Sequence, residues 1–98
     1  MIEIRKTALF AQWLDGLLDL RARARVQARL ERLAGGNPGD VAPVGEGVSE
    51  LRINYGPGYR VYFRQRGRDL IILLAGGNKR TQAQDIKTAL RLARDLSE

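Results

Sequence analysis

The spacing of hydrophobic residues predicts a short strand followed by two helices in the first third of the chain. Isoleucine alternates with charged residues over positions 2–5, as in a strand. Thr7 is a suitable N-cap for a helix that reaches about Leu18, and Asp19 is a suitable N-cap for a second helix that reaches about Ala34. The residues expected to face the core are Phe10, Leu14, Leu17, Leu18, Val26, Leu30, Leu33 and Ala34.

Residues 35–47 form the main predicted loop, because glycine and proline are frequent in this segment. Beyond it the hydrophobic period changes to two, which predicts strands joined by glycine-rich turns. Three strands of an antiparallel meander are expected over residues 50–54, 60–64 and 69–75. The third is apolar almost throughout, which indicates burial on both faces, and residues 76–78 are expected to end it.

A final helix is predicted after the meander. Thr81 and Gln84 match the capping box, and the stripe that would face the core is Ile86, Ala89, Leu90, Ala93 and Leu96. Because the strands of the meander precede the last helix in series, we predict an α+β fold in the order β-α-α-β-β-β-α, with the sheet packed against helices. With 98 residues, the chain is expected to form one domain, and any active site is expected to be an open groove.

Composition narrows the chemistry, because the chain contains no cysteine and no histidine. These absences exclude thiolate ligands, cysteine nucleophiles and the commonest general base. We therefore expect neither a metal nor a cofactor. The longest apolar run, residues 70–75, is too short to span a bilayer, and residues 1–5 lack the apolar segment of a signal peptide. A cytoplasmic protein is therefore expected.

The net charge of +6 is concentrated in two segments. Residues 21–32 contain five arginines against one glutamate, and residues 52–80 contain seven cations against one aspartate. Spacings of four, four and three place Arg21, Arg25, Arg29 and Arg32 on one face of the second helix. Two basic segments in so short a chain indicate a polyanionic partner, an acidic protein partner, or both.

Four segments carry a resemblance to a known family. They are residues 33–40 (LAGGNPGD), 45–53 (GEGVSELRI), 56–63 (GPGYRVYF) and 73–82 (LLAGGNKRTQ), the last followed by Asp85-Ile86. In order and approximate spacing they resemble the RelE/HigB-like toxins of bacterial type II toxin–antitoxin systems, in the subgroup of addiction-module killer proteins. The resemblance covers nearly the whole chain.

The resemblance implies a small sheet packed against two N-terminal helices. It also implies an endonuclease that cuts messenger RNA on the ribosome, and a co-expressed antitoxin that usually carries a helix-turn-helix domain. Two alternatives remain open, because similar folds host different functions. One is a ParE-like inhibitor of DNA gyrase, and the other is a catalytically decayed toxin that still binds its antitoxin.

RNA is cleaved without a metal when its 2′-hydroxyl attacks the adjacent phosphate, a reaction that needs cations and groups that move protons. The candidate catalytic residues are Arg52, Arg60, Tyr62, Lys79 and Arg80. The resemblance implies a phosphate-contacting arginine at Arg60 and a basic pair at Lys79 and Arg80. Similar toxins carry a catalytic Tyr or His near the C-terminus, which this chain lacks. That role therefore falls to Tyr55, Tyr62 or Lys79, or cleavage is weaker or different.

Contacts with RNA or the ribosome are expected from a second set of residues, namely Arg21, Arg25, Arg29, Arg32, Tyr55 and Gln82. Arg64, Arg66 and Arg68 flank a predicted hairpin turn, so they are assigned to the solvated surface. Thr81 is assigned to helix capping rather than to catalysis.

Overall fold

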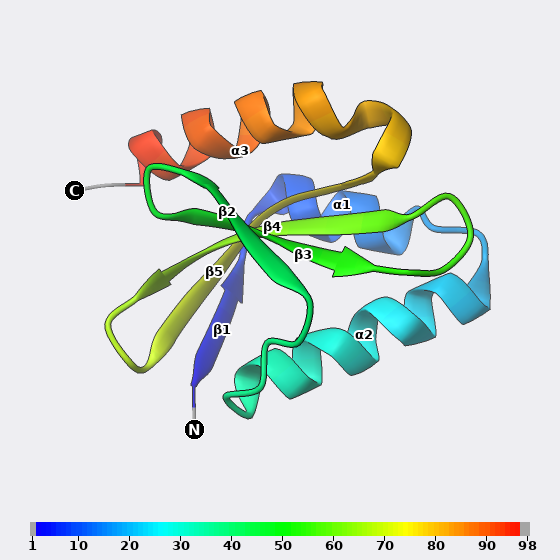
Figure 1. Cartoon of the computed structure of the whole chain (residues 1–98), viewed down its shortest axis with the longest axis horizontal. Helices are drawn as coiled ribbons and strands as arrows, with labels where there is room; N and C mark the ends of the chain where they lie inside the picture. Colours follow the sequence, from blue (N-terminus) through cyan, green and yellow to red (C-terminus); the bar gives the residue numbers. More distant parts are fainter. Residues whose placement is uncertain (1, 97–98) are drawn as a thin grey trace.

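A five-stranded mixed sheet lies between the helices in the computed structural model, which describes residues 2–96 (Figure 1). The elements are β1 (Glu3–Lys6), α1 (Ala8–Asp15), α2 (Leu20–Ala34), β2 (Val41–Gly45), β3 (Val48–Ile53), β4 (Tyr59–Arg66), β5 (Leu70–Asn78), the 3-10 turn η1 (Lys79–Thr81) and α3 (Gln82–Asp95). The strand order is β1-β5-β4-β3-β2, with β1 parallel to β5 and the other neighbours antiparallel. The predicted α+β class is confirmed. None of the helices described over residues 2–96 is long and apolar enough to cross a membrane.

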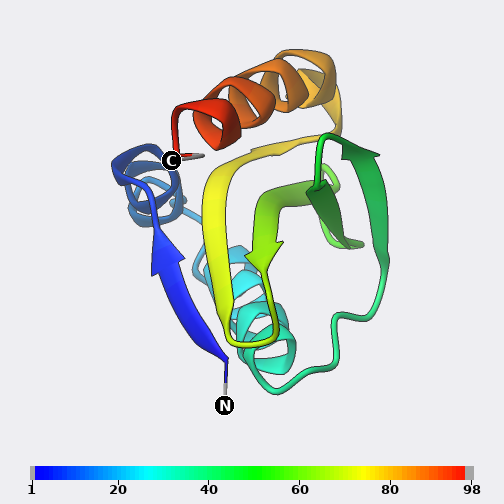
Figure 2. The same cartoon turned by 90° about the vertical axis from the view of Figure 1, so that its left-hand side faces the viewer.

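Both faces of the sheet are covered by helices, as the two views in Figures 1 and 2 show. Successive side chains of a strand point to opposite faces. Leu51 and Val61 belong to the buried cluster under α1 and α2, which also includes Phe10, Leu14, Val26, Leu33, Ile53, Phe63, Ile71 and Leu73. The cluster under α3 includes Val48, Tyr62, Ile72, Leu74, Ala75, Ala89 and Ala93. The nearly continuous apolar sequence of β5 reflects this burial on both faces.

The caps of the first two helices are confirmed, but the first helix is shorter than predicted. The Thr7 hydroxyl accepts a hydrogen bond from the Phe10 amide at 3.0 Å, and the Asp19 carboxylate accepts from the amides at the start of α2. The first helix ends at Asp15 and Gly16 caps it, whereas we predicted that it would reach Leu18. The extended backbone that Asp19 needs as an N-cap forces the chain to leave the helix earlier. Leu18 consequently faces solvent instead of the core.

The predicted loop over residues 35–47 contains an additional strand, β2, which pairs with β3 at the sheet edge. Its Pro43 lacks an amide donor, which an edge strand tolerates. The turn that follows places Glu46 and Gly47 in the left-handed region, at φ of 52° and 80°. Glycine and proline therefore mark a hairpin here and not only a loop.

The final strand continues through the glycine pair that was expected to end it. A bulge in β5 at Leu74 reverses the side-chain alternation, so Gly76 lies on the α1 face and Gly77 on the α3 face. A Cβ on Gly76 would lie 2.2 Å from the Trp13 ring. The two glycines thus leave room for side chains of α1 on one face of the sheet and of α3 on the other.

The predicted capping box of the last helix is wrong in its residues. Thr81 is the N-cap of α3 by position, but its side chain makes no capping hydrogen bond there. Instead Asn78 caps the preceding η1 turn by accepting from the Arg80 amide at 2.9 Å. The Thr81 hydroxyl forms the reciprocal bond to the Asn78 amide and also contacts Asp85. The short 3-10 turn separates β5 from α3 and displaces the cap by three residues.

Candidate functional site

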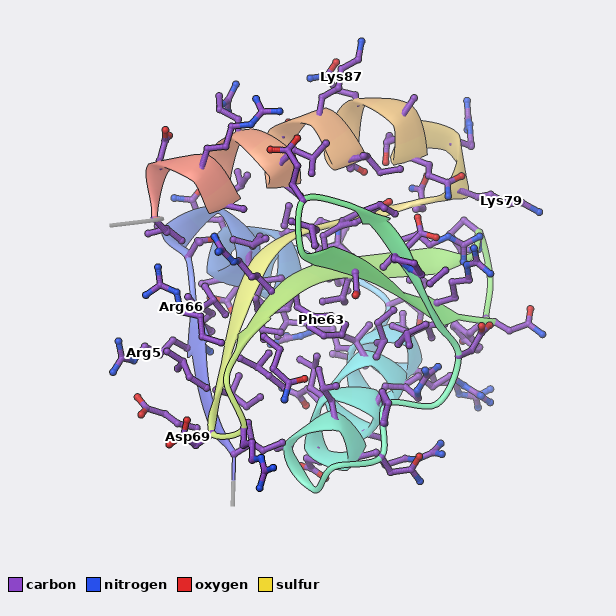
Figure 3. All side chains as sticks on the ribbon, turned by 60° about the vertical axis from the view of Figure 1, so that its left-hand side comes forward. Arg5, Phe63, Arg66, Asp69, Lys79 and Lys87 are labelled. Atoms are coloured by element: carbon purple, nitrogen blue, oxygen red, sulfur yellow. The ribbon has the colours of Figure 1, made fainter. Side chains whose placement is uncertain are left out.

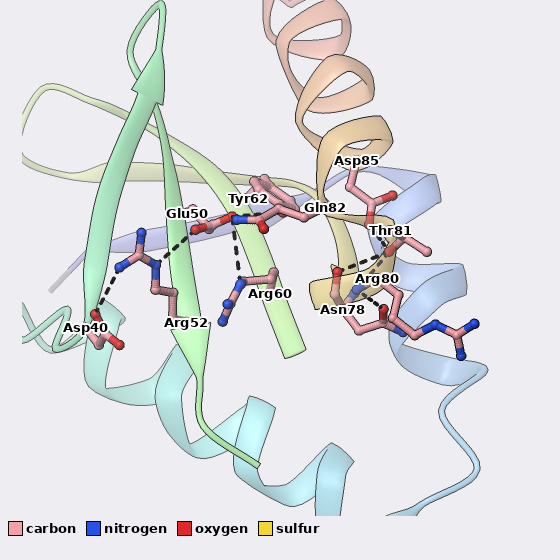
Figure 4. Close-up of polar contacts among 10 residues, drawn as sticks. All are labelled: Asp40, Glu50, Arg52, Arg60, Tyr62, Asn78, Arg80, Thr81, Gln82 and Asp85. Atoms are coloured by element: carbon pink, nitrogen blue, oxygen red, sulfur yellow. Dashed lines mark hydrogen bonds and ion pairs between the residues drawn. The ribbon is translucent and has the colours of Figure 1, made fainter. Parts of the chain in front are cut away.

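Arg52 and Arg60 lie directly opposite each other in the β3–β4 pairing. Both side chains point to the face of the sheet that α3 covers, but they lie beyond the first residues of that helix (Figure 4). They border a groove of about 340 Å³ whose lining residues are Asp40, Arg52, Asn54, Gly56, Pro57, Gly58, Arg60 and Lys79. Two strands and the β3–β4 turn thus form an open basic groove at one end of the sheet.

A buried carboxylate lies beneath the two arginines. Glu50 is 1% exposed and accepts hydrogen bonds from Arg52 Nε at 3.0 Å and from Tyr62 Oη at 3.1 Å. Gln82 Nε2 donates a third at 2.7 Å, and Arg60 Nε lies 3.9 Å from the same carboxylate (Figure 4). One anion therefore holds two cations from two strands and also connects them to the start of α3.

The surroundings of Glu50 keep this carboxylate ionised. Burial raises the pKa of its carboxyl, but the hydrogen bonds from Arg52, Gln82 and Tyr62 and the charge of Arg60 together bring the pKa below its ordinary value. The hydrogen bond to Glu50 in turn raises the pKa of Arg52. The Glu50–Arg52 pair is therefore fully charged at neutral pH.

Arg60 is the most deeply set cation of the groove, with a side chain that is 12% exposed. Its Nε is buried and has no hydrogen-bond partner among residues 2–96. A buried donor without an acceptor is unfavourable, and the same holds for Arg29 Nε, which lies outside the groove. Because Nε is buried beside Glu50, an anion in the groove would contact the outer nitrogens of the Arg60 guanidinium.

Tyr62 lies below the groove and not on its surface. Its side chain is fully buried, and its hydroxyl donates to Glu50. Burial and the neighbouring charge of Glu50 raise the pKa of the Tyr62 hydroxyl, so it stays protonated at neutral pH. This geometry gives Tyr62 a supporting position beneath the arginines.

The two basic residues of η1 face different directions. Lys79 lines the groove together with Arg60, and Figure 3 shows its side chain extending outward at the edge of the molecule. Gly58 has a positive φ of 80°, a backbone conformation that favours glycine, and a Cβ at this position would lie in ordinary contact with Lys79 Cβ at 3.5 Å. Arg80 extends away from Arg60 in Figure 4 and does not line the groove.

The arginines of α2 do not form one uniform surface. Arg29 is half-buried, and its guanidinium donates to the carbonyls of Pro38, Asp40 and Arg52, so it ties α2 to the chain that precedes β2 and to β3. Arg25 stacks over the Tyr55 ring at 4.6 Å from its centroid. The remaining two members, Arg21 and Arg32, are exposed.

Among the predicted site residues, the groove brings together Arg52, Arg60 and Lys79, with Tyr62 and Gln82 behind them. Glu50, which organises this arrangement, was not among the predicted residues. The sequence did contain an indication of this role, because Glu50 precedes Arg52 by two positions in a strand and therefore lies on the same face of the sheet. Within residues 2–96, no group of three or more metal-ligating side chains could hold a metal ion.

Comparison with known proteins assigns the chain to a family. Residues 12–97 match the family described as phage derived protein Gp49-like (DUF891). An uncharacterised protein of Haemophilus influenzae is 50% identical over 95 residues, which are 97% of this chain and 96% of that protein. The match includes every residue that lines the groove. The chain therefore belongs to the Gp49-like family, a toxin-like, RelE/HigB-like family of toxin–antitoxin systems.

Proposed function

We propose that this protein is the toxin of a type II toxin–antitoxin system and that its groove cleaves messenger RNA on the ribosome. The observation that carries the proposal is the Arg52–Arg60 pair, held from beneath by Glu50 and bordered by Lys79. Paired guanidinium groups match the geometry of phosphate oxygens and bind them through charge-assisted hydrogen bonds. A groove open to solvent is also suited to an extended polymer.

In the proposed reaction, the RNA supplies its own nucleophile. The 2′-oxygen forms a bond to the adjacent phosphorus, and the bond from phosphorus to the 5′-oxygen breaks. The products are a 2′,3′-cyclic phosphate and a 5′-hydroxyl. Arg52 and Arg60 stabilise the additional negative charge of the phosphorane, which is where preorganised cations contribute most.

Two exposed groups of the groove are available for the proton transfers. The Asp40 carboxylate lies 4.0 Å from Arg52 Nη1, and we assign it the role of accepting the 2′-hydroxyl proton. Lys79 is assigned the role of donating a proton to the leaving 5′-oxygen. Tyr62 is given no proton-transfer role, because its hydroxyl is buried against Glu50.

A second candidate is a toxin-like protein that binds its antitoxin but no longer cuts RNA. The burial of Tyr62 favours this reading, since no tyrosine hydroxyl of the described chain lines the groove. It differs from the first proposal in one measurable way, because a protein of this kind leaves messenger RNA intact.

The proposal is tested by inducing the protein alone in a bacterial host. We expect growth to stop, with protein synthesis ceasing before DNA replication, and we expect co-expression of the antitoxin to restore growth. An Arg60→Gln variant should permit growth, whereas Arg68→Gln, at an exposed arginine distant from the groove, should behave as wild type. Intact messenger RNA together with a loss of DNA supercoiling would instead indicate gyrase inhibition.

A further inference from the structure

Two strongly exposed leucines lie at the connection between α1 and α2. Leu18 is 95% exposed and Leu20 is 73% exposed, whereas the intervening Asp19 is occupied with capping α2. The preceding Leu17 turns inward and packs against the buried cluster. The other exposed large hydrophobic residues of the described chain, Leu9 and Leu96, are 43% and 39% exposed. Two large aliphatic side chains this open to water, two positions apart in the chain, are candidates for a binding surface.

The surface beside these leucines is basic. Arg21 and Arg25 follow them on the first turns of α2, and both are exposed. Within residues 2–96 neither guanidinium lies in an ion pair with a carboxylate, and Asp19 instead accepts hydrogen bonds from two backbone amides and from the Tyr55 hydroxyl. Two exposed leucines next to arginines outside any ion pair of residues 2–96 therefore match a partner that is both apolar and acidic.

The chemistry of this surface favours a protein over RNA. Nucleic acids are bound through cations and through aromatic rings on which bases stack, and aliphatic leucine offers neither. In protein interfaces, buried apolar side chains supply most of the affinity, while charges select the partner and speed association. We propose that Leu18 and Leu20, together with Arg21 and Arg25, form the docking surface for an acidic, amphipathic segment of the antitoxin. The inference rests on the proposed function only in requiring that an antitoxin exists.

A partner bound at this surface would lie next to the groove. The Tyr55 hydroxyl donates to Asp19 at 3.3 Å, and Arg25 stacks over the Tyr55 ring. Tyr55 immediately precedes the turn over residues 56–58, which lines the groove. Figure 1 shows the α1–α2 connection and the β3–β4 turn at the same end of the molecule. The antitoxin segment can thus anchor on the leucines and extend toward the groove entrance.

The test uses the protein encoded by the reading frame adjacent to this gene as the antitoxin probe. Its dissociation constant is measured for the wild-type chain, for Leu18→Ser/Leu20→Ser and for Leu96→Ser as a matched control at the opposite end of the molecule. Serine removes the apolar contact without adding charge, and thermal melts verify that each variant folds. We expect the double variant to bind about 100-fold more weakly and the control to bind as wild type.

Cleavage of messenger RNA by the same variants separates this inference from the proposed function. The double variant should cut RNA at the wild-type rate and should resist rescue by the antitoxin in growing cells. Unchanged affinity of the double variant, or the absence of binding to the wild-type chain, overturns the docking surface. Loss of RNA cleavage with antitoxin affinity retained also overturns it, because the leucines would then serve the ribosome. A wild-type chain that binds the antitoxin but cuts no RNA refutes the endonuclease proposal alone.

Discussion

Glu50 accepts a hydrogen bond from Arg52 Nε at 3.0 Å, which pairs a carboxylate that is 1% exposed with a guanidinium that is 42% exposed. The buried anion therefore holds a cation whose outer part remains in solvent. The same carboxylate lies 3.9 Å from Arg60 Nε. This arrangement holds the two arginines close together, and the negative charge of Glu50 offsets the repulsion between them.

Replacing Glu50 with glutamine should destabilise the protein and disorganise the groove. The substitution removes the negative charge that Arg52 and Arg60 share but preserves the shape of the side chain. We expect the free energy of unfolding to fall by about 2 kcal/mol, less than for a fully buried pair because Arg52 is partly solvated. Urea unfolding measures the change, and an unchanged midpoint would show that Glu50 contributes nothing to the fold.

The pKa of Glu50 also predicts how stability depends on pH. A carboxyl whose pKa is lower in the folded state than in the unfolded state stabilises the fold above its unfolded pKa, near ~4.3. That contribution is lost as the pH falls through the folded pKa. Unfolding free energies should therefore decrease below about pH 4.3 in the wild type, and less steeply in Glu50→Gln.

A second glutamate provides the control for this pH series. The hydrogen bond from Arg94 lowers the pKa of Glu46, so this exposed pair should respond to acid in the same direction. Unfolding curves for Glu46→Gln alongside Glu50→Gln therefore separate the two contributions. Identical acid profiles for wild type and Glu50→Gln would refute the assignment of a lowered pKa to Glu50.

Removing the Tyr62 hydroxyl distinguishes a supporting role from a catalytic one. Tyr62→Phe deletes the hydrogen bond to Glu50 at 3.1 Å but keeps the ring in the core under α3. We expect a loss of about 1–3 kcal/mol in unfolding free energy and an RNA cleavage rate within a few-fold of wild type. Cleavage reduced 100-fold in a folded variant would return Tyr62 to the catalytic residues.

The close approach at Gly77 makes the last strand sensitive to a single methyl group. A Cβ at this position would lie 1.8 Å from Asp85 Oδ2 and 2.8 Å from Thr81 Oγ1. Gly77→Ala should therefore destabilise the protein by about 1–3 kcal/mol, because the Asp85 and Thr81 side chains must turn aside and their mutual hydrogen bond is disturbed. Gly35→Ala is the control, since its nearest contact would be an ordinary 3.5 Å. Equal melting temperatures for both variants would argue against this packing.

The elements with strong local signals were predictable from the sequence. Thr7 and Asp19 each carry a side-chain acceptor for backbone amides, so the starts of both early helices are confirmed. The end of the first helix was misplaced, because Leu17 and Leu18 continue the apolar period although only Leu17 packs inward. Periodicity alone does not reveal that the following cap needs an extended residue.

Features that depend on neighbouring strands were harder to predict. Strand β2 was hidden by its glycine and proline content, and only its pairing with β3 makes it a strand. The glycine pair in β5 looked like a strand end, yet its role is to admit Trp13 and Asp85. In the groove, Arg52 and Arg60 were candidates from the strand pattern and the family resemblance, whereas the contact between Glu50 and Gln82 joins residues 32 positions apart. Contacts of that separation depend on the tertiary fold.

The central claim is that the groove cleaves RNA through its arginine pair, and the most direct test is the chemistry of the cut ends. Purified protein is added to ribosomes translating a defined messenger RNA, and the termini of the fragments are identified. We predict 2′,3′-cyclic phosphate and 5′-hydroxyl ends, with a rate lowered at least ~100-fold in Arg60→Gln and unchanged in Arg68→Gln. Intact RNA with the wild-type protein, or wild-type cleavage by a folded Arg60→Gln variant, would contradict the account.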